Sequence, residues 1–297
     1  MSVPTGRKDR YARVGPTELV RQQSSNAFTH GLEAHVTGEH AQLSAFRLAD
    51  LRQRLKPYRL HWFPTLRSTN DHAAILRKRK KLYAPAVVLT GRQTAGRGRG
   101  SNTWWSRAGS LTVTFVVPTD ERIEPHQLPM IAGLAVRNAA AELSGTDTIQ
   151  LKWPNDLQFE GRKLAGLLCE RVLNADFVGI GLNVNLNPDD APKSLGRSIA
   201  SLAQIRGHAL DMTNVLATLA AHLQLMLKRA AGGSFTAILR EYDLHHALIG
   251  KRVTVIHTAD EPPTSGRCEG LDSIGRLLLR ERGKLHHVIS GQVQVRG

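Results

Sequence analysis

The chain has 297 residues, of which 41% are apolar, and it carries 40 Lys and Arg against 25 Asp and Glu, a net charge of +15. The length predicts one large domain or two unequal ones. No run of about 18 apolar residues occurs, which excludes a transmembrane helix, and the N-terminus lacks the apolar core of a secretory signal. Two cysteines exclude a disulfide scaffold and a four-thiolate zinc site. We therefore expect a cytoplasmic protein.

The excess charge is concentrated in residues 61–107, which contain ten Lys and Arg and only one carboxylate, Asp71. A basic block of this kind is typical of a nucleic-acid-binding surface. The run at 77–81 has a simpler interpretation as the solvated end of a helix. The other arginines alternate with glycines, which favours a small phosphorylated ligand.

The predicted elements begin after residues 1–43, a polar N-terminal extension without periodicity that we expect to be weakly ordered. No helix-turn-helix pattern is found there. Apolar spacing predicts helices, and β-branched or alternating runs predict strands. The expected helices are 43–55, 71–80, 128–143, 214–229 and 235–245, and the expected strands up to residue 185 are 60–63, 86–89, 110–117, 149–153, 157–159, 163–171 and 177–185.

Gly250 marks a change of pattern. Five short apolar runs separated by turn residues follow it, and they predict a small β-barrel appended to the larger domain. Strands and helices in 60–249 do not alternate regularly, so a mixed, mainly antiparallel α+β sheet is favoured over a doubly wound one. The predicted organisation is an extension at 1–43, a main domain at 44–249 and a barrel at 250–297.

A glycine-rich segment, Gln93-Thr94-Ala95-Gly96-Arg97-Gly98-Arg99-Gly100-Ser101, follows one predicted strand. Alternating glycines let the backbone approach a ligand closely, and the arginines supply forked donors suited to phosphate. The segment matches neither the Walker loop nor the dinucleotide-binding fingerprint. Taken alone, it fits a phosphate-binding loop and a flexible surface loop equally well.

Three further segments combine charged or amide side chains with glycine or proline. They are Lys152-Trp153-Pro154-Asn155-Asp156, Gly161-Arg162-Lys163-Leu164-Ala165-Gly166 and Gly179-Ile180-Gly181-Leu182-Asn183-Val184-Asn185. Asp156 could hold a divalent ion or pair with Lys152, Lys163 is either exposed at an edge or aimed at a ligand, and strand glycines often mark the close approach of another group. Each segment alone is also compatible with an ordinary turn or strand end.

These four segments in this order, preceded by Ser68-Thr69-Asn70 and followed by a small barrel, resemble the biotin–protein ligases over about residues 45–297. The resemblance implies a catalytic domain related to class II aminoacyl-tRNA synthetases and an SH3-like C-terminal barrel. It implies formation of biotinyl-5′-AMP from biotin and MgATP, and then transfer of biotin to a lysine of a biotin carboxyl carrier domain, usually that of acetyl-CoA carboxylase. No tightly bound cofactor is implied.

The resemblance also assigns site residues. Biotin-binding positions are Ser68, Thr69, Asn70, Gln93, Gly96, Arg97, Gly98, Arg99 and Lys163; nucleotide-binding positions are Arg97, Arg99, Trp104, Asn155, Asp156 and Asn183; catalytic positions are Arg99 and Lys163; and Asp156 is the candidate Mg²⁺ ligand. Because adenylation brings a carboxylate against a triphosphate, cations at these positions would offset the charge repulsion.

Residues 1–43 do not resemble the winged helix of repressor-type members, so operator DNA is not an expected partner, and neither is a membrane. Two alternatives stay open at this point. One is a nucleic-acid-binding protein that uses the basic surface of 61–107. The other is a lipoate ligase of the same fold, although the arginine and triple-glycine motif of that family is missing here.

Overall fold

The structure, a computed structural model, describes residues 45–192, 195, 198–257 and 261–295. The predicted N-terminal extension therefore lies outside the described residues. The helices are α2 (Leu48–Arg54), α3 (Thr69–Lys78), α4 (Leu128–Ser144), η2 (Pro188–Asp190, a 3-10 helix), α5 (Leu202–Arg206), α6 (Met212–Ala231) and α7 (Phe235–Leu244). None of the helices in this described part of the chain has the length and apolarity needed to cross a membrane.

Two larger sheets and one short hairpin contain the strands. These are β1 (Arg59–Leu66), β2 (Ala86–Gln93), β3 (Gly96–Arg97), β4 (Thr103–Trp104), β5 (Ser110–Pro118), β6 (Gln150–Lys152), β7 (Asp156–Phe159), β8 (Arg162–Arg171), β9 (Ala175–Asn183), β10 (Arg252–Ile256), β11 (Thr264–Leu271), β12 (Leu277–Glu281), β13 (Lys284–Val288) and β14 (Gln292–Val295). The seven-stranded sheet has the order β1-β2-β5-β9-β8-β7-β6. Only the β1–β2 pair in it is parallel, which confirms the prediction of a mixed, mainly antiparallel α+β fold.

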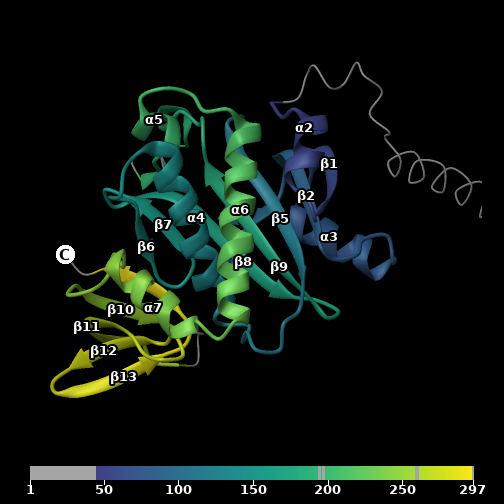
Figure 1. The fold of residues 1–297 in the computed structure, drawn as a ribbon. Coiled ribbons are helices and arrows are strands. Elements are labelled where there is room, and N and C mark those ends of the chain that lie inside the picture. Colours follow the sequence, from purple (N-terminus) through teal and green to yellow (C-terminus); the bar gives the residue numbers. More distant parts are fainter. Residues whose placement is uncertain (1–44, 193–194, 196–197, 258–260, 296–297) are drawn as a thin grey trace, which may run out of the picture. The chain divides into compact units, whose positions relative to one another are not determined.

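The two faces of this sheet differ in chemistry because side chains alternate along a strand. In β9, Val178, Ile180 and Leu182 belong to the hydrophobic core, which α4 and α6 cover on one face of the sheet (Figure 1). The intervening residues of β9 are Gly179, Gly181 and Asn183, and on β5 the residues of that face are Ser110, Thr112 and Thr114. This polar, glycine-lined face carries the site described below.

Helix α3 packs against β2, β5 and β9 and brings its first turn to the polar face. The sequence predicts a start at residue 71, whereas the helix begins at Thr69. Ser68 is the N-cap, and its side-chain oxygen accepts a hydrogen bond from the backbone N–H of Asp71, which satisfies a donor that the helix itself leaves unpaired. Thr69 and Asn70 are consequently helical residues, fixed in direction and buried.

Two other expectations about the elements need correction. The helix predicted from residue 43 begins only at Leu48, because the backbone N–H of Arg47 donates to Thr213 Oγ1 at 2.8 Å and Arg47 itself is not helical. The sequence also did not predict α5, or the pairing of β3 with β4. These elements have at most five residues each, too few for a periodic pattern to be recognised.

The C-terminal strands form an antiparallel five-stranded sheet in the order β13-β12-β11-β10-β14, the small C-terminal β-unit expected from the sequence. Its core includes Val253, Val255, Leu277 and Leu279. The indole N–H of the buried Trp153 donates to the carbonyl of Gly275 at 3.2 Å. That hydrogen bond joins the segment after β6 to the β11–β12 turn, so the C-terminal sheet lies beside the edge of the main sheet that carries part of the site.

Candidate active site

A cavity of about 600 Å³ opens on the polar face of the seven-stranded sheet. Its walls come from α3, from the ends of β2 and β5, from β7, β8 and β9, from the glycine-rich segment, and from the C-terminal sheet. Every predicted site residue except Gly96 lines it: Ser68, Thr69, Asn70, Gln93, Arg97, Gly98, Arg99, Trp104, Asn155, Asp156, Lys163 and Asn183. Five separate segments of the sequence therefore converge on one cavity of a size typical of small-molecule sites.

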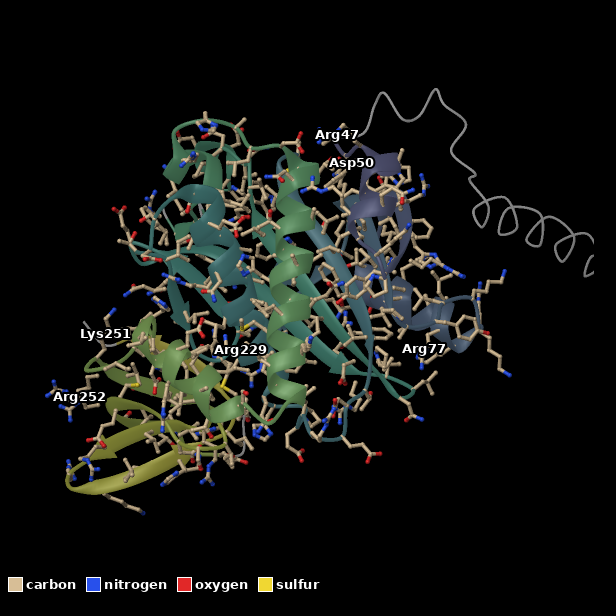
Figure 2. All side chains as sticks on the ribbon, in the orientation of Figure 1. Arg47, Asp50, Arg77, Arg229, Lys251 and Arg252 are labelled. Carbon is tan, nitrogen blue, oxygen red and sulfur yellow. The ribbon has the colours of Figure 1, made fainter. Side chains whose placement is uncertain are left out.

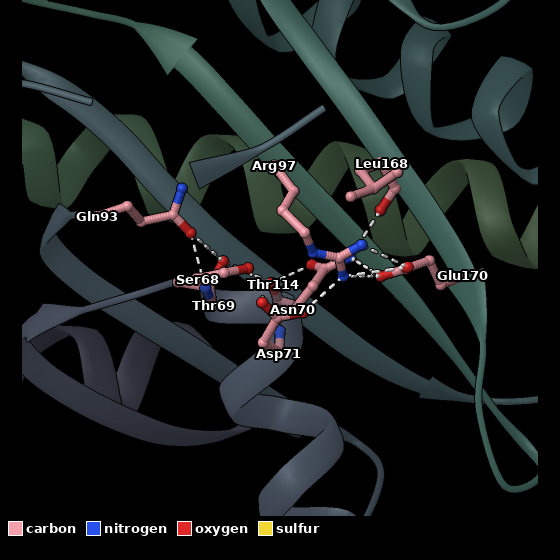
Figure 3. Close-up of polar contacts among 9 residues, drawn as sticks. All are labelled: Ser68, Thr69, Asn70, Asp71, Gln93, Arg97, Thr114, Leu168 and Glu170. Atoms are coloured by element: carbon pink, nitrogen blue, oxygen red, sulfur yellow. Dashed lines mark hydrogen bonds and ion pairs between the residues drawn. The ribbon is translucent and has the colours of Figure 1, made fainter. Parts of the chain in front are cut away.

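One end of the cavity is lined by neutral hydrogen-bonding groups. Gln93 Oε1 accepts from the backbone N–H of Thr69 at 2.7 Å and lies 3.1 Å from its hydroxyl. The buried Thr114 hydroxyl lies 2.6 Å from Asn70 Oδ1 and 2.8 Å from the Thr69 hydroxyl. Because an amide oxygen can only accept, the Thr114 hydroxyl donates to Asn70 Oδ1, and the Thr69 hydroxyl lies within hydrogen-bond distance of both Thr114 and Gln93 Oε1. These contacts fix the side chains before any ligand is present (Figure 3).

The glycine-rich segment folds as a short hairpin over the cavity. β3 pairs with β4 through Gly96↔Trp104 and Arg97↔Thr103, and the Gly98 N–H donates to the Asn102 carbonyl at 2.8 Å. Gly96 does not line the cavity, because it packs between the Gln93 side chain and the Trp104 carbonyl, which would lie 2.8 Å and 2.6 Å from an added Cβ. The segment is thus a turn with defined pairing.

Trp104 is the wall that this hairpin adds to the cavity. A Cβ at Gly181 would lie 2.3 Å from the Trp104 ring, so the indole rests directly on the glycine of β9. The indole N–H is buried and has no hydrogen-bond partner among the residues that the structure describes. A buried donor without a partner is costly, and a ligand with an acceptor in the cavity would satisfy it.

The opposite end of the cavity is charged. Lys163 Nζ lies 2.7 Å from Asp156 Oδ1, with 41% and 27% of the two side chains exposed. Arg99 donates to the carbonyl of Gly291 at 3.1 Å, and it forms no ion pair within the described ranges. Burial lowers the pKa of the Arg99 guanidinium, and the charge of Asp156 opposes that shift. Arg99 therefore presents a partly desolvated positive charge, which favours an anionic ligand.

The remaining predicted residues have structural contacts as well as cavity positions. Asn155 donates through Nδ2 to the Leu167 carbonyl at 2.8 Å. Asn183 donates through Nδ2 to the carbonyl of Ala200 at 3.1 Å and lies 3.3 Å from that of Lys163. In both residues Nδ2 is occupied by backbone carbonyls, so Oδ1 is the atom that could face a nucleotide or a metal-bound water.

Part of the cavity lining comes from residues that the sequence motifs do not include. Thr112 and Lys152 lie in segments already singled out, but the C-terminal sheet also contributes the residues Ile256, His257, Ser290, Gly291, Gln292 and Val293. The only signal in those residues is Ser290-Gly291, which reads as a turn. The motifs do not include Glu170 either, although it contacts both Asn70 and Arg97.

Comparison with known proteins matches the main domain and the C-terminal sheet to biotin protein ligase families. Residues 62–187 match the biotin/lipoate A/B protein ligase family, and residues 248–296 match the biotin protein ligase C-terminal domain. The biotin–[acetyl-CoA-carboxylase] ligase of Paracoccus denitrificans is 30% identical over 222 residues, 72% of this chain and 92% of that protein. The chain belongs to the biotin protein ligase family.

Two further relatives extend this result. The bifunctional ligase/repressor BirA of Bacillus subtilis is 28% identical over 216 residues, which cover 70% of this chain and 66% of that protein, just under two thirds of its length. The structure of biotin protein ligase from Aquifex aeolicus in complex with biotin and ATP superimposes with a TM-score of 0.72 at 27% identity, covering 80% of this chain and 98% of that one. The expected fold is thereby confirmed.

Proposed function

We propose that this chain is an ATP-dependent biotin–protein ligase that forms biotinyl-5′-AMP and transfers the biotinyl group to a lysine of a biotin carboxyl carrier domain. The supporting observation is the division of one cavity into a neutral, hydrogen-bonding end and a cationic end. Biotin has the matching halves, because its cyclic urea is neutral with donors and acceptors and its side chain ends in a carboxylate. The site residues given above, and the division into a main domain at 44–249 and a barrel at 250–297, are part of this proposal.

In the first half-reaction, a biotin carboxylate oxygen attacks the α-phosphorus of MgATP, and the bond to pyrophosphate breaks. Arg99 and Lys163 lie where the negative charges of both reactants meet, so they lower the repulsion and stabilise the charge that develops on the phosphoryl oxygens. The ion pair with Asp156 holds the Lys163 ammonium on the cavity wall. Asp156 is the carboxylate that would hold the Mg²⁺ of MgATP, an ion that would offset negative charge on the phosphates.

In the second half-reaction, the neutral amine of the carrier lysine attacks the acyl carbon, AMP leaves, and the amine loses a proton. The hairpin carrying Trp104 covers the cavity and keeps water from the mixed anhydride before that step. The C-terminal sheet contributes to the same enclosure through Gly291. The proposed acceptor is acetyl-CoA carboxylase, because the name of the matching Paracoccus protein includes it. The proposed location is the cytoplasm.

The direct test is biotin-dependent exchange of labelled pyrophosphate into ATP, with lipoate and octanoate in parallel. Exchange with biotin alone is expected. Exchange with lipoate alone would assign the chain to the other branch that the family name includes. A folded protein that supports no exchange with any of the three acids in the presence of Mg²⁺ would contradict the proposal, and nucleic-acid binding would then be tested.

A further inference from the structure

Glu170, near the end of β8, joins the neutral end of the cavity to the glycine-rich hairpin. Its Oε2 accepts a hydrogen bond from Asn70 Nδ2 at 2.7 Å. The same carboxylate receives both terminal nitrogens of the Arg97 guanidinium, with three N–O distances of 3.0–3.2 Å. One side chain thus contacts a residue of the candidate biotin pocket and a residue of the loop that covers it (Figure 3).

The contact with Asn70 completes the hydrogen bonding of a buried amide. Asn70 Nδ2 also donates to the Leu168 carbonyl at 3.1 Å, and Oδ1 accepts from Thr114. Gly179 lies directly beneath the amide, since an added Cβ would be 2.3 Å from Asn70 Oδ1. The amide therefore has one orientation, and removal of the Glu170 carboxylate leaves one of its two donors unpaired in a buried position.

The contact with Arg97 fixes the hairpin. Arg97 lies 2.7 Å from Asp71 Oδ1 as well as 3.0 Å from Glu170 Oε2, so one cation is held between two carboxylates. The group of three carries a net negative charge, so of the two arginines proposed to bind the nucleotide, Arg99 offers a phosphate the stronger attraction. Arg99 differs, because within the described residues the only hydrogen bond of its side chain is to the Gly291 carbonyl.

The position of this contact indicates what it does. The Arg97, Asp71 and Glu170 side chains are 42%, 46% and 31% exposed, and ion pairs at such exposure add little to global stability. A guanidinium–carboxylate pair with several N–O contacts does, however, specify one geometry, and here Arg97 joins β3 to α3 and β8. Closing of the hairpin and ordering of the Asn70 amide are therefore coupled through the same carboxylate.

We propose that Glu170 is a positioning residue, which holds Arg97 as the latch of the glycine-rich hairpin and holds the Asn70 amide in its binding orientation. The inference rests on the proposed ligase function for its kinetic consequences. Its structural consequence, protection of residues 94–104, does not depend on catalysis. Two variants separate the two contacts of Glu170. Glu170→Ala removes both, whereas Glu170→Gln keeps a neutral acceptor for Asn70 and loses the ion pair with Arg97.

The kinetic test measures the KM for biotin in pyrophosphate exchange and the release of biotinyl-5′-AMP, read as biotinylation of a bystander protein. Glu170→Ala is expected to raise both about tenfold, the equivalent of about one charge-assisted hydrogen bond. Glu170→Gln is expected to raise adenylate release by a similar factor with a much smaller change in KM. The matched control is Glu269→Gln, because Glu269 forms a side-on pair with Arg280 on the C-terminal sheet, away from the cavity.

Hydrogen exchange of residues 94–104 without ligand provides the readout that is independent of activity. Faster exchange in both Glu170 variants, with exchange elsewhere unchanged, is the expected result. The melting temperature should stay at the wild-type value in Glu170→Gln and fall only slightly in Glu170→Ala, where one buried Asn70 donor loses its partner. Unchanged exchange, KM and adenylate release in folded Glu170→Ala would overturn the inference. If the wild-type protein supports no pyrophosphate exchange, the function has failed, and the hydrogen-exchange result alone decides on the latch.

Discussion

Substitution of Gly181 by alanine tests whether the contact between β9 and the Trp104 indole keeps the cavity closed. The added Cβ would lie 2.3 Å from one carbon of the indole and 2.6 Å from two others. Carbon atoms in contact are separated by about 3.5 Å or more, so one group must move by about 1.2 Å. β9 is paired on both sides, through Gly181↔Thr112 and Gly181↔Gly166, whereas Trp104 belongs to a two-stranded hairpin. We expect the indole to move.

A displacement of about 1 Å near reacting groups can cost about 100-fold in rate. Gly181→Ala is therefore expected to lower biotin-dependent pyrophosphate exchange about 100-fold, with little change in melting temperature because the core face of β9 is untouched. Gly133→Ala is the control, since its Cβ would meet Leu151 Cδ2 at 3.4 Å, an ordinary contact. Combining Gly181→Ala with Trp104→Leu restores space above the strand, and this double variant should lose less biotin affinity than Gly181→Ala alone. Wild-type exchange in Gly181→Ala would refute the reasoning.

Three other predictions concern charge. Arg99→Gly should release the adenylate and label bystander lysines, and labelling confined to the carrier domain would argue against retention by Arg99. Lys163→Met should lower the exchange rate about 100- to 1000-fold, as loss of one oriented charge does elsewhere, and Asp156→Asn should cost less if Asp156 mainly orients Lys163. Burial lowers the pKa of His61 and His72 from 6.5, so the unfolded chain binds protons more readily and stability should fall as pH drops below about 6.5. Melting temperatures between pH 7.5 and 5 should fall less steeply in His61→Leu and His72→Leu, and an unchanged slope in both would contradict this assignment.

The sequence predicted one face of the site because strand periodicity shows which side chains share a face, and glycines within a strand indicate where another group packs closely. Alternation in 110–117 separates apolar from hydroxyl side chains, and the structure places Thr112 on the cavity face. Glycines at 179 and 181 were interpreted as the close approach of another group. The structure identifies the groups as the Asn70 amide and the Trp104 ring.

The sequence could not predict contacts that depend on segments far apart in the chain. Glu170 has no motif around it, and its partners lie 100 and 73 residues away. The Gly291 carbonyl accepts a hydrogen bond from the Arg99 guanidinium, 192 residues away in the chain. These pairs form only because β8 lies beside α3 and the C-terminal sheet lies beside the cavity. A local sequence pattern holds no information about either arrangement.

The basic block at 61–107 shows why composition alone gave an ambiguous prediction. Its single carboxylate, Asp71, pairs with Arg97, and β8 supplies the second carboxylate that makes this cation a latch. The run at 77–81 lies at the C-terminal end of α3, which ends at Lys78 with Arg79 as its cap. Cations there stabilise the negative end of the helix dipole. Arg77, labelled in Figure 2, also donates to the Leu173 carbonyl in the β8–β9 turn.

The cations of this block therefore have different structural roles. Arg97 is neutralised, and the cations at the end of α3 stabilise the helix end. Arg99 faces the cavity, and within the part of the chain that the structure describes its side chain is paired only with a backbone carbonyl. Arg97 and Arg99 are two residues apart in one motif and look equivalent in the sequence. Their difference arises because the strand pairing of β3 directs one towards α3 and β8, while the turn after it carries the other towards the cavity and the C-terminal sheet. A phosphate in the cavity would consequently interact more strongly with Arg99, whose positive charge is not neutralised by a carboxylate. Neutralising Arg97 should therefore change the order of the hairpin more than it changes the affinity for nucleotide.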